Sequence, residues 1–107
     1  MTPWQQAYTW ALAHGVTPEE WEHKIQHCLQ AGWVISTPEE FVAAHPTEHD
    51  GQPAYFVFMA CGGSGHPLHR FLRYAPRPVP WVLWHRRNEK RLRAFRWDQL
   101  AKKARIQ

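Results

Sequence analysis

The sequence predicts an α+β fold in which an acidic helical half, residues 1–46, packs on a basic half, residues 53–107. Three observations predict it: repeated segments typical of helix starts, a change to strand-like patterning after Pro53, and a reversal of charge between the halves. The chain has 107 residues, 44% of them hydrophobic and 14% aromatic, which suits a single core. We therefore expect one domain, residues 1–107, with three helices packed on a small three-stranded sheet that includes a C-terminal β-hairpin.

The segment Thr-Pro-x-Glu/Gln occurs three times, beginning at Thr2, Thr17 and Thr37, and each copy predicts a helix start. A threonine hydroxyl can cap the helix, proline suits its first position, and Glu or Gln at the third position completes a capping box. Gly15 and Gly32 stand where a left-handed glycine would end the first two helices. The predicted helices are residues 3–14, 18–31 and 38–45, the last ending before Pro46.

Apolar residues in the first two predicted helices recur at helical spacing, which predicts one buried stripe on each. The stripe of the first helix is Trp4, Tyr8, Ala11 and Leu12, and that of the second is Trp21, Ile25, Cys28 and Leu29. We expect both stripes to face the core.

After Pro53 the pattern changes to strands and two further helices. Residues 54–60 are a continuous β-prone run, which predicts a central strand buried on both faces. The other predicted elements are a glycine turn at 61–65, a helix at 66–74, hairpin strands at 81–86 and 92–97, and a last helix at 99–106 capped by Asp98.

Charge is strongly divided along the chain. Residues 1–60 carry a net charge of −6 and residues 61–107 a net charge of +10, within an overall charge of +4. This asymmetry favours a polyanionic or acidic partner that faces the second half. The alternative is that the two halves neutralise each other within the fold.

The predicted hairpin from Trp81 to Trp97 interleaves aromatic and cationic side chains. Guanidinium groups bind phosphates, and aromatic rings stack on bases, so this composition predicts a polyanion-binding surface. Its candidate residues, with the lysines that follow, are Trp84, Arg86, Arg87, Lys90, Arg91, Arg93, Arg96, Lys102 and Lys103. The alternative is that the aromatic rings are core and the arginines protect a sheet edge.

The glycine turn Gly62-Gly63-Ser64-Gly65 follows a predicted buried strand and precedes a predicted helix. Backbone N–H groups in such a turn, together with the helix N-terminus, can hold a phosphate or pyrophosphate. A turn that needs glycine only for its backbone conformation is the alternative.

These residues resemble the acyl-CoA-binding half of the GNAT acetyltransferases over about residues 54–86. That family has a strand, an Arg/Gln-x-x-Gly-x-Gly/Ala loop, a helix and a second strand. Gly63 and Gly65 match the loop, whereas Ala60 stands where the family has Arg or Gln. Helices are predicted here where the family has its preceding strands. The resemblance implies acyl-CoA binding at the glycine turn.

The sequence contains eight histidines and two cysteines, but no pattern that predicts a metal or catalytic centre. His23 and His27 lie four residues apart on a predicted helix, yet a zinc site needs three or four ligands brought together. Cys61 or Ser64 near His66 lacks an acid to orient the imidazole. We predict no metal, no catalytic residue and no resident cofactor.

Two cysteines are too few for a disulfide-stapled scaffold and suit a reducing cytosol. No apolar run approaches the roughly 18 residues of a membrane span, and the first residues lack the pattern of a secretory signal. We therefore predict a small cytoplasmic binding module, without membrane contact, whose hairpin engages nucleic acid or an acidic protein surface. Its size and acidic half would also suit a phage- or prophage-encoded inhibitor of a host complex. The alternative is a reduced GNAT-like acyltransferase that binds acyl-CoA at Gly62–Gly65.

Overall fold

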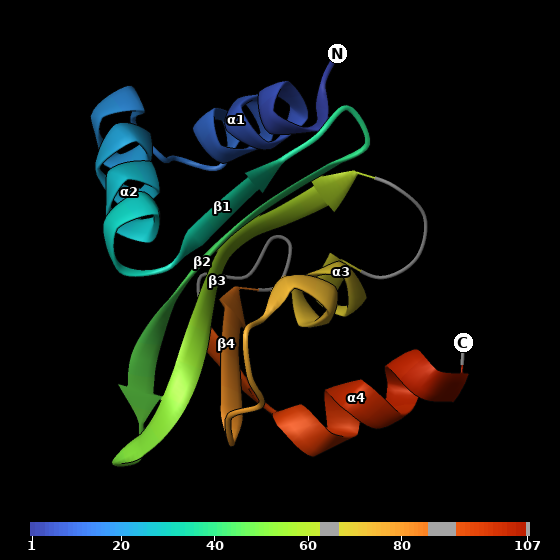
Figure 1. The fold of residues 1–107 in the computed structure, drawn as a ribbon. Coiled ribbons are helices and arrows are strands. Elements are labelled where there is room, and N and C mark those ends of the chain that lie inside the picture. Colours follow the sequence, from blue (N-terminus) through green and yellow to red (C-terminus); the bar gives the residue numbers. More distant parts are fainter. Residues whose placement is uncertain (63–66, 86–91, 107) are drawn as a thin grey trace.

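The computed structural model describes residues 1–62, 67–85 and 92–106, and within these the side chains of 67–70 and 103–106 are not described. The described chain forms four helices and five strands (Figure 1). In chain order these are α1 (Pro3–Ala13), α2 (Pro18–Ala31), β1 (Trp33–Ser36), β2 (Glu40–His49), β3 (Gln52–Gly62), α3 (Pro67–Tyr74), β4 (Trp81–His85), β5 (Leu92–Arg96) and α4 (Trp97–Ile106).

The strands form one mixed sheet in the order β1-β2-β3-β4-β5. Neighbouring strands are antiparallel except β3 and β4, which are parallel and are joined by a connection that contains α3. The prediction of three N-terminal helices on a three-stranded sheet is therefore wrong. The segment predicted as a third helix, residues 38–45, is mostly the strand β2, and the short strand β1 was not predicted.

The third Thr-Pro segment forms a turn between β1 and β2. The hydroxyl of Thr37 accepts hydrogen bonds from the N–H groups of Glu39 (3.2 Å) and Glu40 (2.9 Å), as a helix cap would. The backbone N–H of Thr37 also donates to the carbonyl of Glu40 at 2.9 Å, which closes the turn. Phe41 then lies in one core cluster and Val42 in the other, so side chains alternate between the two faces as in a strand.

Proline within β2 is compatible with its place in the sheet. β1 pairs with β2 only at Phe41–Ala44, so Pro46 lies where β2 has lost its neighbour on that side. A missing N–H is best tolerated at such an edge.

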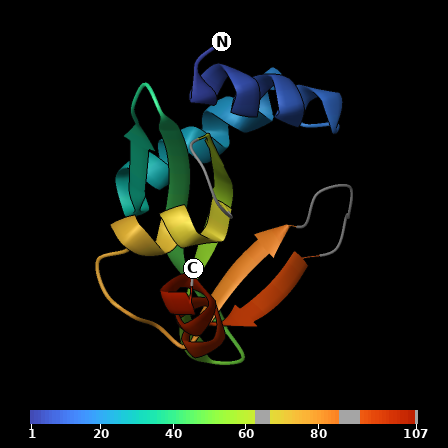
Figure 2. The same cartoon turned by 90° about the vertical axis from the view of Figure 1, so that its right-hand side faces the viewer.

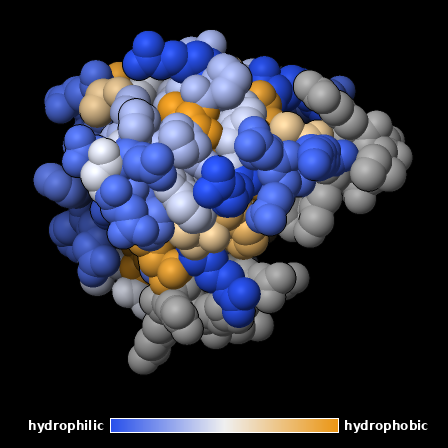
Figure 3. Space-filling model, turned by 90° about the horizontal axis from the view of Figure 1, so that it is seen from below, coloured by the Kyte–Doolittle hydropathy of each residue, from blue (hydrophilic) through white to orange (hydrophobic). Residues whose placement is uncertain are grey.

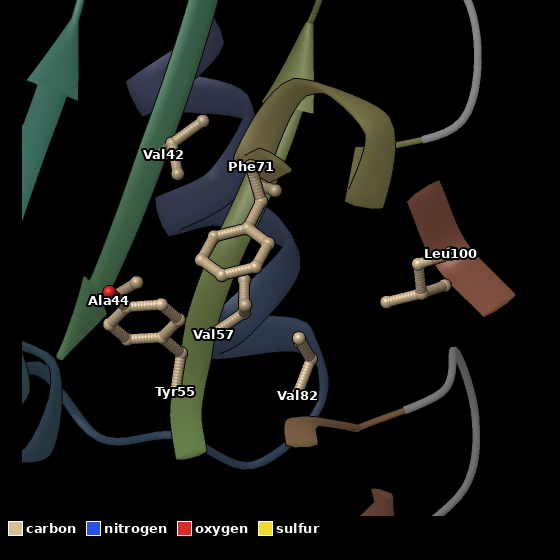
Figure 4. Close-up of a cluster of buried hydrophobic side chains, with 8 residues drawn as sticks. Val42, Ala44, Tyr55, Val57, Phe71, Val82 and Leu100 are labelled. Carbon is tan, nitrogen blue, oxygen red and sulfur yellow. The ribbon is translucent and has the colours of Figure 1, made fainter. Parts of the chain in front are cut away.

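Helices cover both faces of the sheet. α1 and α2 lie on one face at the upper left of Figure 1, and α3 and α4 lie on the other; Figure 2 shows these last two in front of the strands. The cluster under α3 and α4 centres on Val42, Val57, Phe71 and Val82 (Figure 4). The cluster under α1 and α2 contains Trp21, whose ring is stacked 6.1 Å from that of Phe41.

Of the four predicted end residues of α1 and α2, three have the predicted role and one does not. Thr2 and Thr17 cap the two helices, and Gly15 after α1 has a positive φ of 92°. Gly32 ends α2 without a left-handed backbone, since its φ is −137°. Glycine is needed there because a Cβ would overlap the backbone of Ala44.

The predicted buried stripes are only partly correct. α1 buries Pro3, Ala7 and Ala11, whereas Trp4 is 44% exposed and Leu12 is 39% exposed. Small alanines let α1 approach the sheet closely; of the predicted stripe only Ala11 is fully buried, and Tyr8 packs against the cluster under α1 and α2. On α2, Trp21 and Cys28 are buried, but Leu29 is 55% exposed.

The basic half follows the predicted order of elements. The predicted strand 54–60 lies within β3, the predicted helix 66–74 matches α3, and the hairpin strands match β4 and β5. The last helix begins at Trp97, so Asp98 lies in its first turn instead of capping it.

The surface seen from the end that carries the β2–β3 turn is mostly hydrophilic, with apolar residues only in small patches (Figure 3). None of the helices in the described part of the chain has the length and apolar character needed to cross a membrane.

Candidate functional site

The parallel strands β3 and β4 stay paired over only part of their length. Ala54–Val57 of β3 pair with Trp81–Trp84 of β4, after which β3 continues to Gly62 beside β2. The pairing ends where β3 has an irregularity: Ala44 lies opposite Val57 and Ala43 opposite Met59, which leaves Phe58 as an extra residue. Such a bulge bends and twists the strand that carries it.

The bulge changes which side chains face which helices. Val57 and Ala60 lie in the cluster under α3 and α4, whereas Phe58 and Met59 both lie in the cluster under α1 and α2. The neighbouring side chains of Phe58 and Met59 therefore lie on the same face of the sheet, the face that carries α1.

A pocket of about 410 Å³ lies at this divergence. Its walls come from α1, the end of β3 and the end of β4, and the residues that line it are Gln6, Ala7, Trp10, Phe58, Met59, Ala60, Cys61, Trp84 and His85. Most of these residues are apolar, and the exposed polar residues Gln6 and His85 come from opposite walls. An apolar lining with a few polar groups is typical of small-molecule sites.

A larger hollow of about 530 Å³ lies along α2, lined by Pro18, Glu19, Glu22, His23 and Gln26. All of its walls belong to one helix, so it cannot enclose a ligand. We therefore take the pocket between α1, β3 and β4 as the candidate site.

Cys61 connects the pocket to the start of α1. Its thiol donates a hydrogen bond to the carbonyl of Pro3, with a sulfur–oxygen distance of 2.9 Å. The other cysteine, Cys28, is fully buried, and burial raises the pKa of its thiol to about 11, so it stays protonated at neutral pH. Neither cysteine forms a disulfide.

The predicted glycine turn begins at the rim of this pocket. Gly62 has a φ of 90°, and a Cβ on it would overlap the carbonyl of Glu39 and lie 3.0 Å from the ring of Pro3. Glycine is therefore required there both for its backbone angle and for close packing against α1. Gly63, Ser64 and Gly65 lie outside the described residues.

Glu40, which lies opposite Gly62 in the sheet, is a buried carboxylate with one ionic partner. The residue is 8% exposed, and its Oε1 accepts a hydrogen bond from Arg73 of α3 at 3.1 Å. Its Oε2 is buried and has no hydrogen-bond partner among the described residues. The ion pair ties α3 to the start of β2.

The described part of the hairpin places its predicted binding residues on more than one surface. Trp84 lines the pocket and pairs across the sheet with Arg93. Arg96 lies over the ring of Trp81, 5.3 Å from its centre, on the opposite face of the hairpin. Lys102 is exposed on α4. Four predicted residues, Arg86, Arg87, Lys90 and Arg91, lie outside the described residues, as does the side chain of Lys103.

Several pocket residues, among them Gln6, Ala7, Trp10, Phe58 and Met59, were not singled out from the sequence. Trp10 does not lie on the predicted buried stripe of α1. A large aromatic residue outside that stripe is the one sequence signal that could have indicated a site on α1. The apolar run of β3 is continuous, so its sequence does not indicate at which residue a bulge occurs.

Across the described residues, no group of three or more His, Cys, Asp or Glu side chains could hold a metal ion. Comparisons of this chain with protein families, with curated proteins and with solved structures found no match. The pocket therefore has to be interpreted from its own chemistry.

Proposed function

We propose that this chain binds an acyl-CoA in the pocket between α1, β3 and β4. The observation that carries the proposal is the position of the pocket at the carboxyl ends of two parallel strands that diverge, β3 and β4. Ligands of open α/β sheets bind outside the carboxyl ends of such strands. The volume of about 410 Å³ lies within the range of about 300–1,000 Å³ common for small-molecule pockets.

The order of elements also supports this proposal. β3, the glycine segment, α3 and β4 follow one another as do the strand, loop, helix and strand of the GNAT acetyltransferases that residues 54–86 resemble. The helices expected before this region are partly replaced by the strands β1 and β2, which brings the chain closer to that family's arrangement.

The two ends of an acyl-CoA suit different parts of this region. Phe58, Met59 and Trp84 offer apolar contact to the acyl and pantetheine chain. The N–H groups of the Gly62–Gly65 segment would hold the phosphates, as the sequence predicts. Ala60 is buried and supplies no polar group where the family has Arg or Gln. We assign no residue to catalysis, because the thiol of Cys61 donates to Pro3.

Calorimetric titration with acetyl-CoA, a longer acyl-CoA, ATP and inorganic phosphate tests the proposal. Gln6→Trp places a large ring at the exposed rim of the pocket and is expected to weaken acyl-CoA binding at least tenfold. Thr9→Trp is the matched control, because Thr9 is exposed on α1 and does not line the pocket. Gly65→Val is also expected to remove binding. Absence of acyl-CoA binding at millimolar concentration, or equal binding by both tryptophan variants, would overturn the proposal.

A second function, polyanion binding, is favoured by the net charge of +10 on residues 61–107. Each phosphate contact on duplex DNA contributes about 0.9 to the slope of log affinity against log salt. Replacing Arg86, Arg87, Arg91 and Arg93 together by Gln is expected to lower that slope. An unchanged slope would show that the hairpin is not the contact surface.

A further inference from the structure

Part of the sheet face that carries α1 and α2 continues past the C-terminal end of α2, which borders it through Lys24 and His27. α2 ends at Ala31 beside β1 and β2, and the lower left of Figure 1 shows β2 and β3 running on beyond it. We call this region the open sheet face and define it by His45, His49, Phe56, Trp81, His85 and Arg96.

The register of the strands places these side chains in adjacent rows. His45 lies opposite Phe56 across β2 and β3, and Phe56 lies opposite Leu83 of β4. In the next row on this face, Trp81, two residues before Leu83 on β4, lies opposite Arg96 of β5. Residues directly opposite each other share a face, so the rows form one surface across four strands.

The rings on this face contact one another. The ring centres of His45 and Phe56 are 5.3 Å apart, those of Phe56 and His85 are 6.2 Å apart, and those of His49 and Trp81 are 4.9 Å apart. Trp81 is also fixed by a hydrogen bond of 2.8 Å from its Nε1 to Gln52. Phe56 and Trp81 are only half-buried, so part of each side chain remains accessible.

Each of the two aromatic rings has a cation beside it. Lys24 of α2 lies over the ring of Phe56 at 5.3 Å, and Arg96 lies over the ring of Trp81 at 5.3 Å. Both cations are exposed. At the β2–β3 turn, the carboxylate of Asp50 lies 4.0 Å from a ring nitrogen of His49. The face therefore combines accessible rings with exposed positive charge.

We infer that the open sheet face binds a single-stranded nucleic acid. Bases stack on the rings of Phe56 and Trp81, and phosphates lie against Lys24 and Arg96. Single strands present free base surfaces to such rings, whereas the bases of a duplex are already stacked on each other. The inference rests on the polyanion-binding function proposed above and assigns it a different surface and a preferred ligand. The open sheet face and the acyl-CoA pocket share only His85.

Fluorescence anisotropy with labelled oligo(dT), oligo(U), a DNA duplex and an oligoglutamate peptide of equal length tests the inference. Base stacking is worth about 1–3 kcal/mol per base, so Phe56→Leu and Trp81→Leu are each expected to weaken single-strand binding about tenfold. Phe56→Tyr and Trp81→Tyr keep a ring and are expected to bind nearly as the unchanged protein does. Trp4→Leu and Arg77→Gln are controls, since both residues are exposed and lie elsewhere.

The outcomes separate this inference from the function on which it rests. Single-strand binding that is stronger than duplex binding, and weakened only in the two leucine variants, supports it. Equal binding by the leucine and tyrosine variants overturns it. Retention of the unchanged protein on a heparin column, which presents a different polyanion, would then still support the polyanion-binding function. Failure to bind any of the nucleic acids or heparin overturns both. Preferential binding of the oligoglutamate at this face overturns it in favour of an acidic protein partner.

Discussion

The tetrapeptide Thr-Pro-Glu-Glu occurs twice in this chain, once at the start of α2 and once at the turn into β2. Its local hydrogen bond is the same in both places: Thr17 accepts from the N–H of Glu20 at 3.1 Å, and Thr37 accepts from the N–H of Glu40 at 2.9 Å. One copy begins a helix, and the other closes a turn into a strand. A capping threonine therefore marks where a helix can begin without deciding that it does.

The residues after each tetrapeptide decide the outcome. After the first copy, Trp21 and Cys28 recur at helical spacing and are buried on one side of α2. After the second, Phe41 and Val42 are adjacent, and each is buried in a different cluster. A helix would send neighbouring residues toward one side or into solvent, whereas a central strand buries both.

The largest expected effect is on stability, and it tests the ring contact between the residues that follow the two tetrapeptides. Trp21 and Phe41 directly follow the two tetrapeptides, and their rings stack 6.1 Å apart. Trp21→Ala and Phe41→Ala are each expected to cost about 3–5 kcal/mol in urea unfolding. The double variant is expected to cost less than the sum, because the residues share a contact. Trp4→Ala is the control on α1, and a cost for Phe41→Ala no larger than the control's would contradict the position of β2.

The second prediction concerns the last residue of the second copy, Glu40. Arg73→Ala leaves the buried carboxylate of Glu40 without its ionic partner. A fully buried pair loses about 3–5 kcal/mol in this way. The side chain of Arg73 is 63% exposed, so water compensates and about 1–2 kcal/mol is expected. Arg77→Ala is the matched control, since Arg77 is exposed and forms no ion pair with another described residue. Equal stability of the two variants would rule out a role for the pair.

The third prediction compares the two threonines. Thr17→Ala and Thr37→Ala are each expected to lose about 1 kcal/mol, because each removes the acceptor for a backbone N–H. Thr17→Ser and Thr37→Ser keep the hydroxyl and are expected to restore most of the loss. A Thr37→Ala variant as stable as the unchanged protein would show that the turn forms without its cap.

The fourth and smallest effect concerns two histidines that lie further along the same elements. His27 of α2 and His45 of β2 have ring centres 4.3 Å apart. Burial, foremost, lowers the pKa of His45 below its ordinary 6.5; its hydrogen bond to Pro46 opposes this, and the nearby His27 and Lys24 add to it. The unfolded chain then binds this proton more readily than the folded one. The contribution to stability is complete above pH 6.5 and is lost as the pH falls below that value.

Urea midpoints at several pH values between about 7.5 and about 5.5 measure this effect. The unchanged protein is expected to lose stability on acidification, and His45→Gln to lose less. His23→Gln is the control, since His23 is exposed on α2. The same pH dependence in all three proteins would exclude a contribution from His45.

Several individual elements could be predicted from local pattern, whereas the five-stranded sheet and most of the site could not. Capping and spacing located α1 and α2, and the β-prone run located β3, because these signals lie within single elements. β1 is four residues long and is formed through pairing with β2, which local patterning does not reveal. The pocket depends on α1, β3 and β4 meeting, and on one extra residue in β3, so its residues are far apart in sequence.

The bulge at Phe58 has a consequence for how such a site could arise or disappear. Val57 and Met59 already lie opposite the consecutive residues Ala44 and Ala43, so removing Phe58 would leave the pairing with β2 in regular register. A straighter β3 would then let its hydrogen bonds to β4 continue past Trp84, where the strands now separate. The loss of a single codon would thus extend the pairing of β3 with β4 and close the pocket between α1, β3 and β4.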